Sequence, residues 1–356
     1  MSARSTIPVH ILTGFLGSGK TTLLNQALTS SSGFGADTAI VVNEFGDVAL
    51  DQMFIQERSD ETVVLKSGCI CCSIRIDLVS TLMQLAAMSD ARARPLSRIV
   101  IETSGISDPA PILTTLGSDF RLLTRFHVGA IVCVVDATDD GSPRAEAVAQ
   151  LAAADACVVT KRDLAGSQPE GSVGRRIRRL NPDAAVIPAD RFASWIESRD
   201  TPNRDIAQVL ARLKPEVTAV LPGHSVRSLV LRTASPASWP RFAIWLSALM
   251  FAHGDRILRM KGLLYDQARD TWVAVHGVRR FLHPPEHLPS GRGSTRDASL
   301  VFIVDGLDPA LIERSYRQWV LAESDPDARP LAKIDAADLV PESTAMALAM
   351  NEGVAR

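Results

Sequence analysis

Long apolar runs and a disulfide framework are both missing from this sequence. No segment approaches the roughly 20 apolar residues needed to cross a bilayer, and the longest candidate, residues 128–135, has the length of a buried strand. The five cysteines are odd in number and three fall within four positions, unlike the pattern of a disulfide-stabilised secreted protein. The apolar start at residues 7–12 runs into a glycine-rich motif that cleavage of a signal peptide would destroy. We therefore expect a cytoplasmic protein with no membrane partner.

The sequence also has little net charge. With 38 Lys and Arg residues against 40 Asp and Glu residues, the formal net charge is −2, so no nucleic-acid partner is expected. The one basic cluster, residues 175–179, is typical of a solvent-exposed helix face. Apolar residues make up 46% of the chain, which is enough for an ordinary globular core.

The chain length and the alternation of patterns predict the first domain. At 356 residues the chain exceeds the usual size of one domain, so two are expected. Over the first two hundred residues, short apolar runs alternate with helical patterns, which is typical of an α/β fold with a doubly wound, mostly parallel sheet. The expected strands are residues 9–13, 38–43, 62–66, 98–102, 129–136, 157–160 and 185–188. The expected helices are residues 20–28, 77–88, 144–153 and 173–180.

The second half of the chain has a different pattern. Proline and glycine punctuate residues 215–223, which indicates a linker. The strands and helices expected beyond it suggest a smaller α+β domain with an antiparallel sheet: strands at residues 225–233, 256–265, 272–276 and 300–304, and helices at residues 239–253 and 309–321. The predicted division is therefore a domain at residues 1–215, a domain at residues 222–323 and a tail at residues 324–356.

A phosphate-binding loop follows the first expected strand. The pattern Gly14-x-x-x-x-Gly19-Lys20-Thr21 lies between an apolar strand and a helix, as a P-loop requires. Backbone N–H groups of such a loop face the phosphates, Lys20 reaches the β- and γ-phosphates, and Thr21 offers its hydroxyl to Mg²⁺. The predicted nucleotide-binding residues of this segment are Gly14, Gly17, Ser18, Gly19, Lys20, Thr21 and Thr22. The alternative is a chance match in a glycine-rich turn.

The end of a later apolar strand completes the predicted phosphate site. Glu102 stands there, where its carboxylate can hold Mg²⁺ directly or through water, and the N–H of Gly105 can sense the γ-phosphate. The predicted catalytic residues are thus Lys20, Thr21, Glu102 and Gly105. A charged strand end that faces solvent is the alternative for Glu102.

Recognition of the base is predicted at Thr160, Lys161 and Asp163, again after an apolar strand. Guanine presents N1–H and N2–H₂ as adjacent donors, and the Asp163 carboxylate can accept both, whereas adenine presents no such pair. The aliphatic part of Lys161 can cover the face of the base. We therefore expect GTP and GDP as the nucleotides.

A cluster of thiols precedes the helix expected from residue 77. It consists of Cys69, Cys71 and Cys72. A nearby helix N-terminus stabilises thiolates, and three soft sulfurs favour Zn²⁺ or Cu(I) over Mg²⁺, with a fourth position left for another ligand. The alternatives are a redox pair formed by Cys69 and Cys72, or inert buried thiols.

Two other pairs of residues have less specific patterns. Glu44 and Asp47 follow the second expected strand and are further candidates for the Mg²⁺ site or the thiolate site, with an ordinary polar loop as the alternative. Cys133 and Cys157 lie inside apolar strands and are expected in the core.

These motifs, in this order, resemble those of the CobW-type GTPases, a cobalamin-biosynthesis and zinc-regulated metallochaperone family of the SIMIBI class of P-loop GTPases. The resembling segments are residues 14–22, 43–46, 68–72, 102–105, 108–109, 160–163, 258–262 and 300–303. The resemblance implies a domain that binds GTP and Mg²⁺, a cysteine motif that takes Zn²⁺ or Co²⁺, and transfer of the metal to a client protein. Thr160 replaces the family's usual asparagine. No histidine-rich stretch is present, so metal storage is not expected.

The sequence therefore predicts a GTPase that binds Zn²⁺ or Co²⁺ at its thiols and delivers it to a client metalloprotein, as a monomer or a homo-oligomer. Slow intrinsic turnover is expected because no residue is an obvious general base or arginine finger. The alternatives are an ATP-dependent kinase built on the same loop, a nucleotide-gated metal sensor without turnover, and a thiol oxidoreductase.

Overall fold

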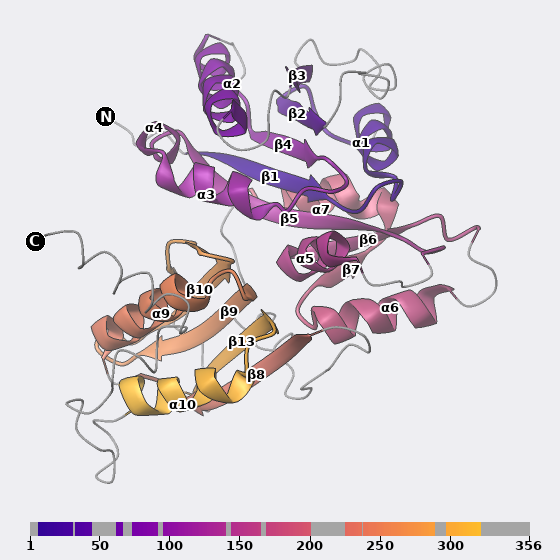
Figure 1. Cartoon of the computed structure of the whole chain (residues 1–356). Coiled ribbons are helices and arrows are strands. Elements are labelled where there is room, and N and C mark those ends of the chain that lie inside the picture. Colours follow the sequence, from indigo (N-terminus) through magenta and orange to yellow (C-terminus); the bar gives the residue numbers. More distant parts are fainter. Residues whose placement is uncertain are drawn as a thin grey trace, which may run out of the picture. The chain divides into compact units, whose positions relative to one another are not determined.

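A computed structural model describes the chain over residues 6–30, 33–44, 62–66, 73–91, 95–139, 144–164, 169–200, 225–236, 238–288 and 297–321. These residues form two compact units, residues 6–200 and residues 225–321 (Figure 1). The predicted domain limits at residues 215, 222 and 323 lie outside the described residues, so those limits stay predictions. Within the described part, no helix combines the length and the apolar composition needed to span a membrane.

The first unit is built on a seven-stranded sheet in the order β3-β2-β4-β1-β5-β6-β7, and every neighbouring pair of strands is parallel. Its strands are β1 (Ile7–Thr13), β2 (Thr38–Glu44), β3 (Thr62–Lys66), β4 (Arg98–Thr103), β5 (Phe126–Asp136), β6 (Ala156–Thr160) and β7 (Ala185–Ile187). All residues of β1 and β4 are buried, which explains the apolar residues at their centres. The predicted parallel α/β sheet is confirmed.

Helices cover this sheet on both faces. They are α1 (Lys20–Thr29), α2 (Ser73–Asp90), α3 (Ala110–Ser118), α4 (Phe120–Leu123), α5 (Ala145–Ala153), α6 (Pro169–Leu180), the 3₁₀ turn η2 (Ala189–Arg191) and α7 (Phe192–Glu197). The core against one face joins Leu23 and Leu24 of α1 and Phe192 of α7 to strand residues such as Leu12 and Val100. Figure 1 shows α2, α3 and α5 on the other side of the sheet.

Three helices of this unit were not predicted, and two helices, α2 and α6, begin four residues earlier than predicted. The helices α3, α4 and α7 are short. The N-cap of α3 is Pro109, whose side chain makes no capping hydrogen bond, and the Asp108 carboxylate before it accepts from the N–H of Ala110 at 2.9 Å. Helix α2 begins at Ser73 rather than residue 77, so the helix starts directly after Cys72. The apolar periodicity becomes clear only from residue 78, which explains the late prediction.

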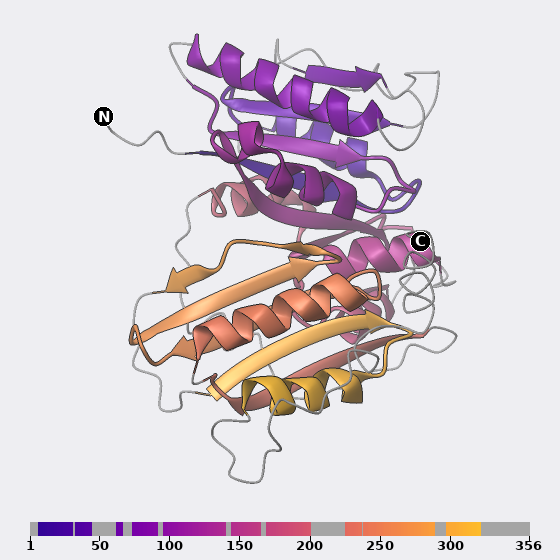
Figure 2. The ribbon, with the colours of Figure 1, turned by 60° about the vertical axis from the view of Figure 1, so that its left-hand side comes forward.

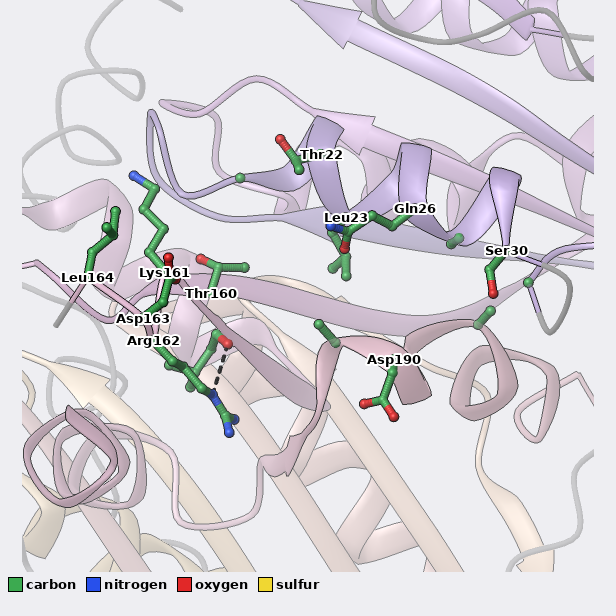
Figure 3. Close-up of a pocket in the computed structure, with 16 residues that line it drawn as sticks. Thr22, Leu23, Gln26, Ser30, Thr160, Lys161, Arg162, Asp163, Leu164 and Asp190 are labelled. Atoms are coloured by element: carbon green, nitrogen blue, oxygen red, sulfur yellow. Dashed lines mark hydrogen bonds between the residues drawn. The ribbon is translucent and has the colours of Figure 1, made fainter. Parts of the chain in front are cut away.

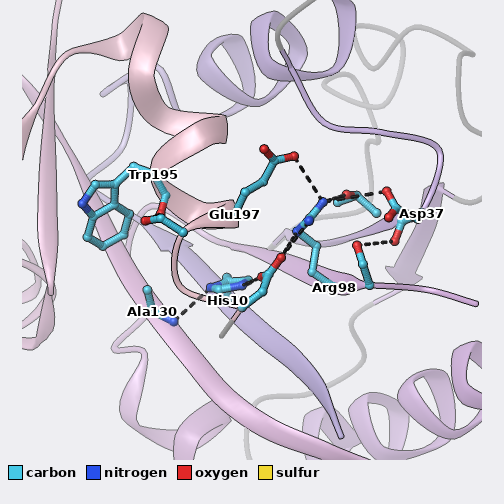
Figure 4. A network of polar contacts seen from close by, with 10 residues as sticks. His10, Asp37, Arg98, Ala130, Trp195 and Glu197 are labelled. Carbon is cyan, nitrogen blue, oxygen red and sulfur yellow. Dashed lines mark hydrogen bonds and ion pairs between the residues drawn. The ribbon is translucent and has the colours of Figure 1, made fainter. Parts of the chain in front are cut away.

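A buried polar network ties the end of the first unit to its sheet (Figure 4). The ring of His10, which is wholly buried in β1, accepts from the N–H of Ala130 at Nδ1 (3.0 Å), so Nε2 donates to Asp200 (3.0 Å). The Arg98 guanidinium binds Asp200 at 2.7 Å and lies 3.5 Å from Glu197. The segment after α7 is therefore held against β1 and β4.

The second unit is an antiparallel sheet covered by two helices, as Figure 2 shows in orange and yellow. Its elements are β8 (Val226–Ala234), α9 (Trp239–His253), β9 (Ile257–Asp266), β10 (Thr271–Val278), β11 (Phe281–Leu282), β12 (Glu286–Leu288), β13 (Asp297–Asp305) and α10 (Pro309–Val320). The strand order is β11-β10-β9-β13-β8, with β12 also paired to β10. The core between sheet and helices contains Phe242, Trp245, Phe302 and Tyr316. The predicted α+β architecture is confirmed.

Candidate nucleotide site

The predicted phosphate loop connects the end of β1 to the start of α1. Its backbone adopts conformations that favour glycine, with φ of +145° at Gly14 and +92° at Gly19. A side chain at Gly14 would also meet the carbonyl of Val134 at 2.4 Å, so this position has room only for hydrogen. Strand, loop and helix thus have the arrangement that lets backbone N–H groups surround phosphates at a helix N-terminus.

The polar side chains of this loop fit a phosphate ligand. The Lys20 ammonium is buried and donates to the carbonyl oxygens of Gly14 (2.8 Å) and Phe15 (3.3 Å), which holds its charge inside the loop. The Ser18 hydroxyl is buried in the loop, and among the described residues it has no hydrogen-bond partner. A buried hydroxyl normally has a partner, so a ligand oxygen at this place would satisfy it.

Thr21 and Glu102 meet as the sequence predicted. The Thr21 hydroxyl donates to Oε1 of Glu102 at 2.6 Å, although the two residues are 81 positions apart. The contact follows from the sheet order, because β1 and β4 are neighbours and Leu12 pairs with Glu102. A hydroxyl and a carboxylate beside a phosphate loop form an oxygen donor set that suits Mg²⁺. These two residues would hold the ion.

Gly105 lies against the phosphate loop. A Cβ atom placed on it would come within 2.7 Å of both the backbone N and the Cα of Leu16. The loop that follows β4 therefore touches the phosphate loop directly. This closeness fits the predicted sensing of the γ-phosphate, which itself stays a prediction.

A cavity of about 710 Å³ extends from the start of α1 to the end of β6 and to η2 (Figure 3). It brings together the predicted residues Gly19, Thr22, Thr160, Lys161 and Asp163. It is also lined by residues that were not predicted as ligands, namely Leu23, Gln26, Ala27, Ser30, Gly33, Val159, Arg162, Leu164, Ala189, Asp190 and Ala193. They are ordinary residue types on α1, β6, η2 and α7 and in the segments that follow α1 and β6, and nothing in their spacing marks them as ligands.

The base-recognition segment is held in place by contacts to its neighbours. The Thr160 hydroxyl donates to the carbonyl of Ser18 at 2.6 Å and lies 3.3 Å from that of Val135. Lys161 has a φ of +53°, unusual for a residue other than glycine, and its ammonium binds Asp136 at 2.6 Å. Burial raises the pKa of Asp136, but hydrogen bonds from Lys161 and Thr138 outweigh it and hold the pKa below its usual value. Asp136 is therefore ionised and anchors Lys161.

The predicted metal ligands lie outside the described residues. This applies to Cys69, Cys71, Cys72 and Asp47, and of Glu44 only the backbone at the end of β2 is described. In the described ranges, no three His, Cys, Asp or Glu side chains gather closely enough to hold a metal ion.

The two strand cysteines are core residues, as expected. Cys133 and Cys157 are buried in β5 and β6. Burial raises the pKa of the Cys133 thiol to about 12, so it stays protonated at neutral pH. A protonated, buried thiol is neither a nucleophile nor a metal ligand.

The fold and the phosphate loop define a P-loop nucleotide-binding domain joined to a second, antiparallel domain. Residues 8–188 match the family model described as CobW/HypB/UreG, nucleotide-binding domain, and residues 226–319 match the cobalamin synthesis protein cobW C-terminal domain. The chain therefore belongs to the CobW-type GTPase family.

Several relatives share this family. The chain is 29% identical to the zinc chaperone YjiA of Escherichia coli over 302 residues, covering 83% of this chain and 93% of YjiA. It is 31% identical over 196 residues to the zinc-regulated GTPase metalloprotein activator 1 of Schizosaccharomyces pombe, covering 52% of this chain and 46% of that protein. The crystal structure of Zn(II)-bound YjiA GTPase from E. coli has the same fold, with a TM-score of 0.60 and 24% identity over 88% of this chain and 99% of that one.

Proposed function

We propose that this protein is a GTP-hydrolysing metallochaperone that binds Zn²⁺, or Co²⁺, through Cys69, Cys71 and Cys72 and delivers it to a client metalloprotein. The observation that carries the proposal is the contact of Thr21 with Glu102 beside the phosphate loop, in a chain that matches 93% of the length of a zinc chaperone. The partner is the client metalloprotein. GTP is the substrate, and the metal is the cargo.

The nucleotide half of the function rests on described residues. Lys20 places a buried positive charge at the phosphates, and Asp163 accepts from the guanine edge. Thr21 and Glu102 hold Mg²⁺, which supplies positive charge to the phosphates when it is bound. Turnover is slow because these groups bind and orient GTP, while the sequence offers no recognisable general base to activate water.

The metal half of the function rests on the sequence and on the start of α2. The helix begins at Ser73, directly after the cysteine segment in the sequence, and a helix N-terminus is an environment that favours thiolates. Three thiolates leave one position of a tetrahedral Zn²⁺ site for a ligand from the client. A site with one exchangeable position suits transfer of the metal better than permanent structural binding.

The two halves are coupled in this proposal. The cysteine segment joins β3 to α2 in the same unit as the phosphate loop. If GTP changes the affinity for Zn²⁺, then Zn²⁺ must change the affinity for GTP by the same factor. Hydrolysis to GDP then favours release of the metal to the client.

A metal titration tests this function. Zn²⁺ and Co²⁺ are titrated against a chromophoric chelator in the presence of a non-hydrolysable GTP analogue or GDP. We expect one tightly bound Zn²⁺ per chain and an affinity that differs at least about fivefold between the two nucleotides. The double variant Cys69→Ser with Cys72→Ser loses the site, whereas Cys157→Ala, which changes a buried core thiol, keeps it.

Two results would contradict the proposal. Unchanged metal binding in the double cysteine variant would remove the thiol site and would favour a redox role for the cluster. Equal Zn²⁺ affinities with the analogue and with GDP would remove the coupling. Phosphate release from GTP, measured with and without Zn²⁺, separates a GTPase from a sensor that only binds nucleotide.

A further inference from the structure

One buried amide on α5 binds the loop that follows β4. Gln150 is 0% exposed, and its Nε2 donates to the carbonyl oxygens of Gly105 (3.1 Å) and Ser107 (3.0 Å). The residues are more than forty positions apart in the sequence, so the contact depends on the fold. An amide with both donors used on one loop restricts the orientation of that loop strongly.

The same loop is pressed against the phosphate loop on its other side. The nearest neighbours of Gly105 are the backbone N and Cα of Leu16, with no room for a side chain between them. The N–H of Ser107 donates to the carbonyl of Ser104 at 3.1 Å, which closes the segment into a turn. Gly105 is thus held between Gln150 and the phosphate loop.

The contact also determines where the N–H groups of the turn point. In a trans peptide, a carbonyl and the N–H of the next residue point in opposite directions. Because the carbonyls of Gly105 and Ser107 face Gln150, the N–H groups of Ile106 and Asp108 point away from α5. Gln150 therefore leaves these two N–H donors of the loop on the side away from α5.

The N-cap residue of α5 contacts the phosphate loop itself. Arg144, which directly precedes α5, places its guanidinium 4.6 Å from the centroid of the Phe15 ring. It also lies 3.7 Å from Asp139, which binds Arg176 at 3.2 Å. One short helix thus touches both loops that approach the phosphates.

We propose that Gln150 is a positioning residue that holds the turn at Gly105 against the phosphate loop, so that this turn responds to the third phosphate of GTP. The inference rests on the proposed GTPase function and deepens it. Loss of the amide frees the turn, and the protein then distinguishes GTP from GDP less well. Binding of GDP, which has no third phosphate, stays as it is.

The chain contains a matched control for Gln150. Asn181 is another buried amide, and it donates to the carbonyls of Leu151 (2.9 Å), Ala152 (3.1 Å) and Ala154 (2.8 Å). These carbonyls lie at the far end of the same helix. Asn181→Leu therefore removes a buried amide that binds the C-terminal end of α5, without touching the loop after β4.

The experiment measures the affinities of a non-hydrolysable GTP analogue and of GDP for the full chain and its variants. We expect Gln150→Met, and likewise Gln150→Glu, to weaken analogue binding about tenfold while GDP binding stays within about twofold. Asn181→Leu lowers the melting temperature but leaves the ratio of the two affinities unchanged. Should Gln150→Met not fold, Gly105→Ala provides the same readout, because its Cβ pushes the turn away from Leu16.

The role of Gln150 would be overturned if Gln150→Met weakened the binding of the analogue and of GDP equally, or if it weakened the binding of neither. A changed ratio in Asn181→Leu would overturn it as well, since the effect would then be general to α5. If the unaltered chain binds neither GTP nor the analogue, the proposed function fails together with this inference. If the unaltered chain binds both nucleotides and Gln150→Met leaves the ratio of the two affinities unchanged, only this inference fails and the proposed function stands.

Discussion

The hydroxyl of Thr160 donates to the carbonyl of Ser18 at 2.6 Å, which joins the end of β6 to the phosphate loop. The family's usual asparagine is absent at this position, but the threonine hydroxyl still connects the base-recognition segment to the loop. The methyl group of Thr160 also lies within 3.7 Å of the place where a Cβ on Gly19 would be. The departure from the family pattern thus keeps a physical link between the two halves of the nucleotide site.

Thr160→Val tests this link because it keeps the shape of the side chain and removes only the donor. The buried carbonyl of Ser18 then loses its bond, which costs about 1–2 kcal/mol. We expect the affinities for GTP and GDP to fall together by about tenfold, measured by fluorescence of a labelled nucleotide. Thr115→Val is the control, since that hydroxyl binds only the carbonyl of Pro111 within α3, and nucleotide affinity should not change there.

Asp163→Asn tests the choice of base. An amide cannot accept both donors of guanine, so we expect GTP affinity to fall on the order of a hundredfold. Xanthosine triphosphate, whose base carries a carbonyl in place of the N2 amine, should bind the variant better than it binds the unaltered chain. Competition by ATP, or full GTP affinity in the variant, would argue for a kinase. Asp255→Asn makes the same change at an exposed ion pair of the second unit and should have no effect.

Glu102→Gln tests the Mg²⁺ site. The amide keeps the size of the side chain but loses its negative charge, and Mg²⁺ binds carboxylates far better than neutral amides. We expect GTP turnover to fall about a hundredfold and GTP affinity to become almost independent of Mg²⁺ concentration. Turnover is followed by phosphate release over a Mg²⁺ series. Glu313→Gln, at an exposed pair with Arg317 on α10, should leave both quantities unchanged.

Asp200→Asn tests the network around His10 and Arg98. Burial raises the pKa of Asp200, but the hydrogen bonds from His10 and Arg98 outweigh it and hold the pKa below its usual value of 3.8. A carboxyl whose pKa is lower in the folded state stabilises the fold above the unfolded pKa, and this contribution is lost as pH falls through the folded pKa. We expect the variant to be about 2 kcal/mol less stable at pH 7, with the difference shrinking below about pH 4.

The measurement for this last variant is urea unfolding of the full chain at several pH values. Asp90→Asn is the comparison, because Asp90 binds Arg125 at an exposed site and should cost far less. A difference between Asp200→Asn and the unaltered chain that persists unchanged down to pH 3 would contradict the ionic origin of the effect.

The parts of the site that sequence could predict are those with local patterns. β1, β4 and β6 are rich in apolar residues and end in Thr13, Thr103 and Thr160, so the strands and the motifs beside them could be predicted together. The contact of Thr21 with Glu102 agrees with the assignment of both residues to Mg²⁺, which was possible because both lie near the carboxyl ends of strands of one parallel sheet. Local spacing carries this information directly.

The parts that could not be predicted depend on which strands are neighbours. Gln150 looks like any polar residue on an alanine-rich helix, and its two bonds appear only once α5 lies beside the loop after β4. Asp190 and Gln26 line the cavity for the same reason. His10 is a polar residue in an apolar strand, and its partner Asp200 is 190 positions away. No periodicity in the chain indicates such pairs.

The pairing of the strands also determines when this site can exist. Leu12 pairs with Glu102 and Asp136 with Thr160, and the bond between Thr160 and Ser18 joins residues 142 positions apart. Parallel pairings of this range form slowly, because the chain must close long loops before the contacts are made. A growing chain that ends before β6 therefore has a phosphate loop but no complete nucleotide site. Completion of the site thus requires that the chain extends at least to Thr160 and that β6 has paired with β5.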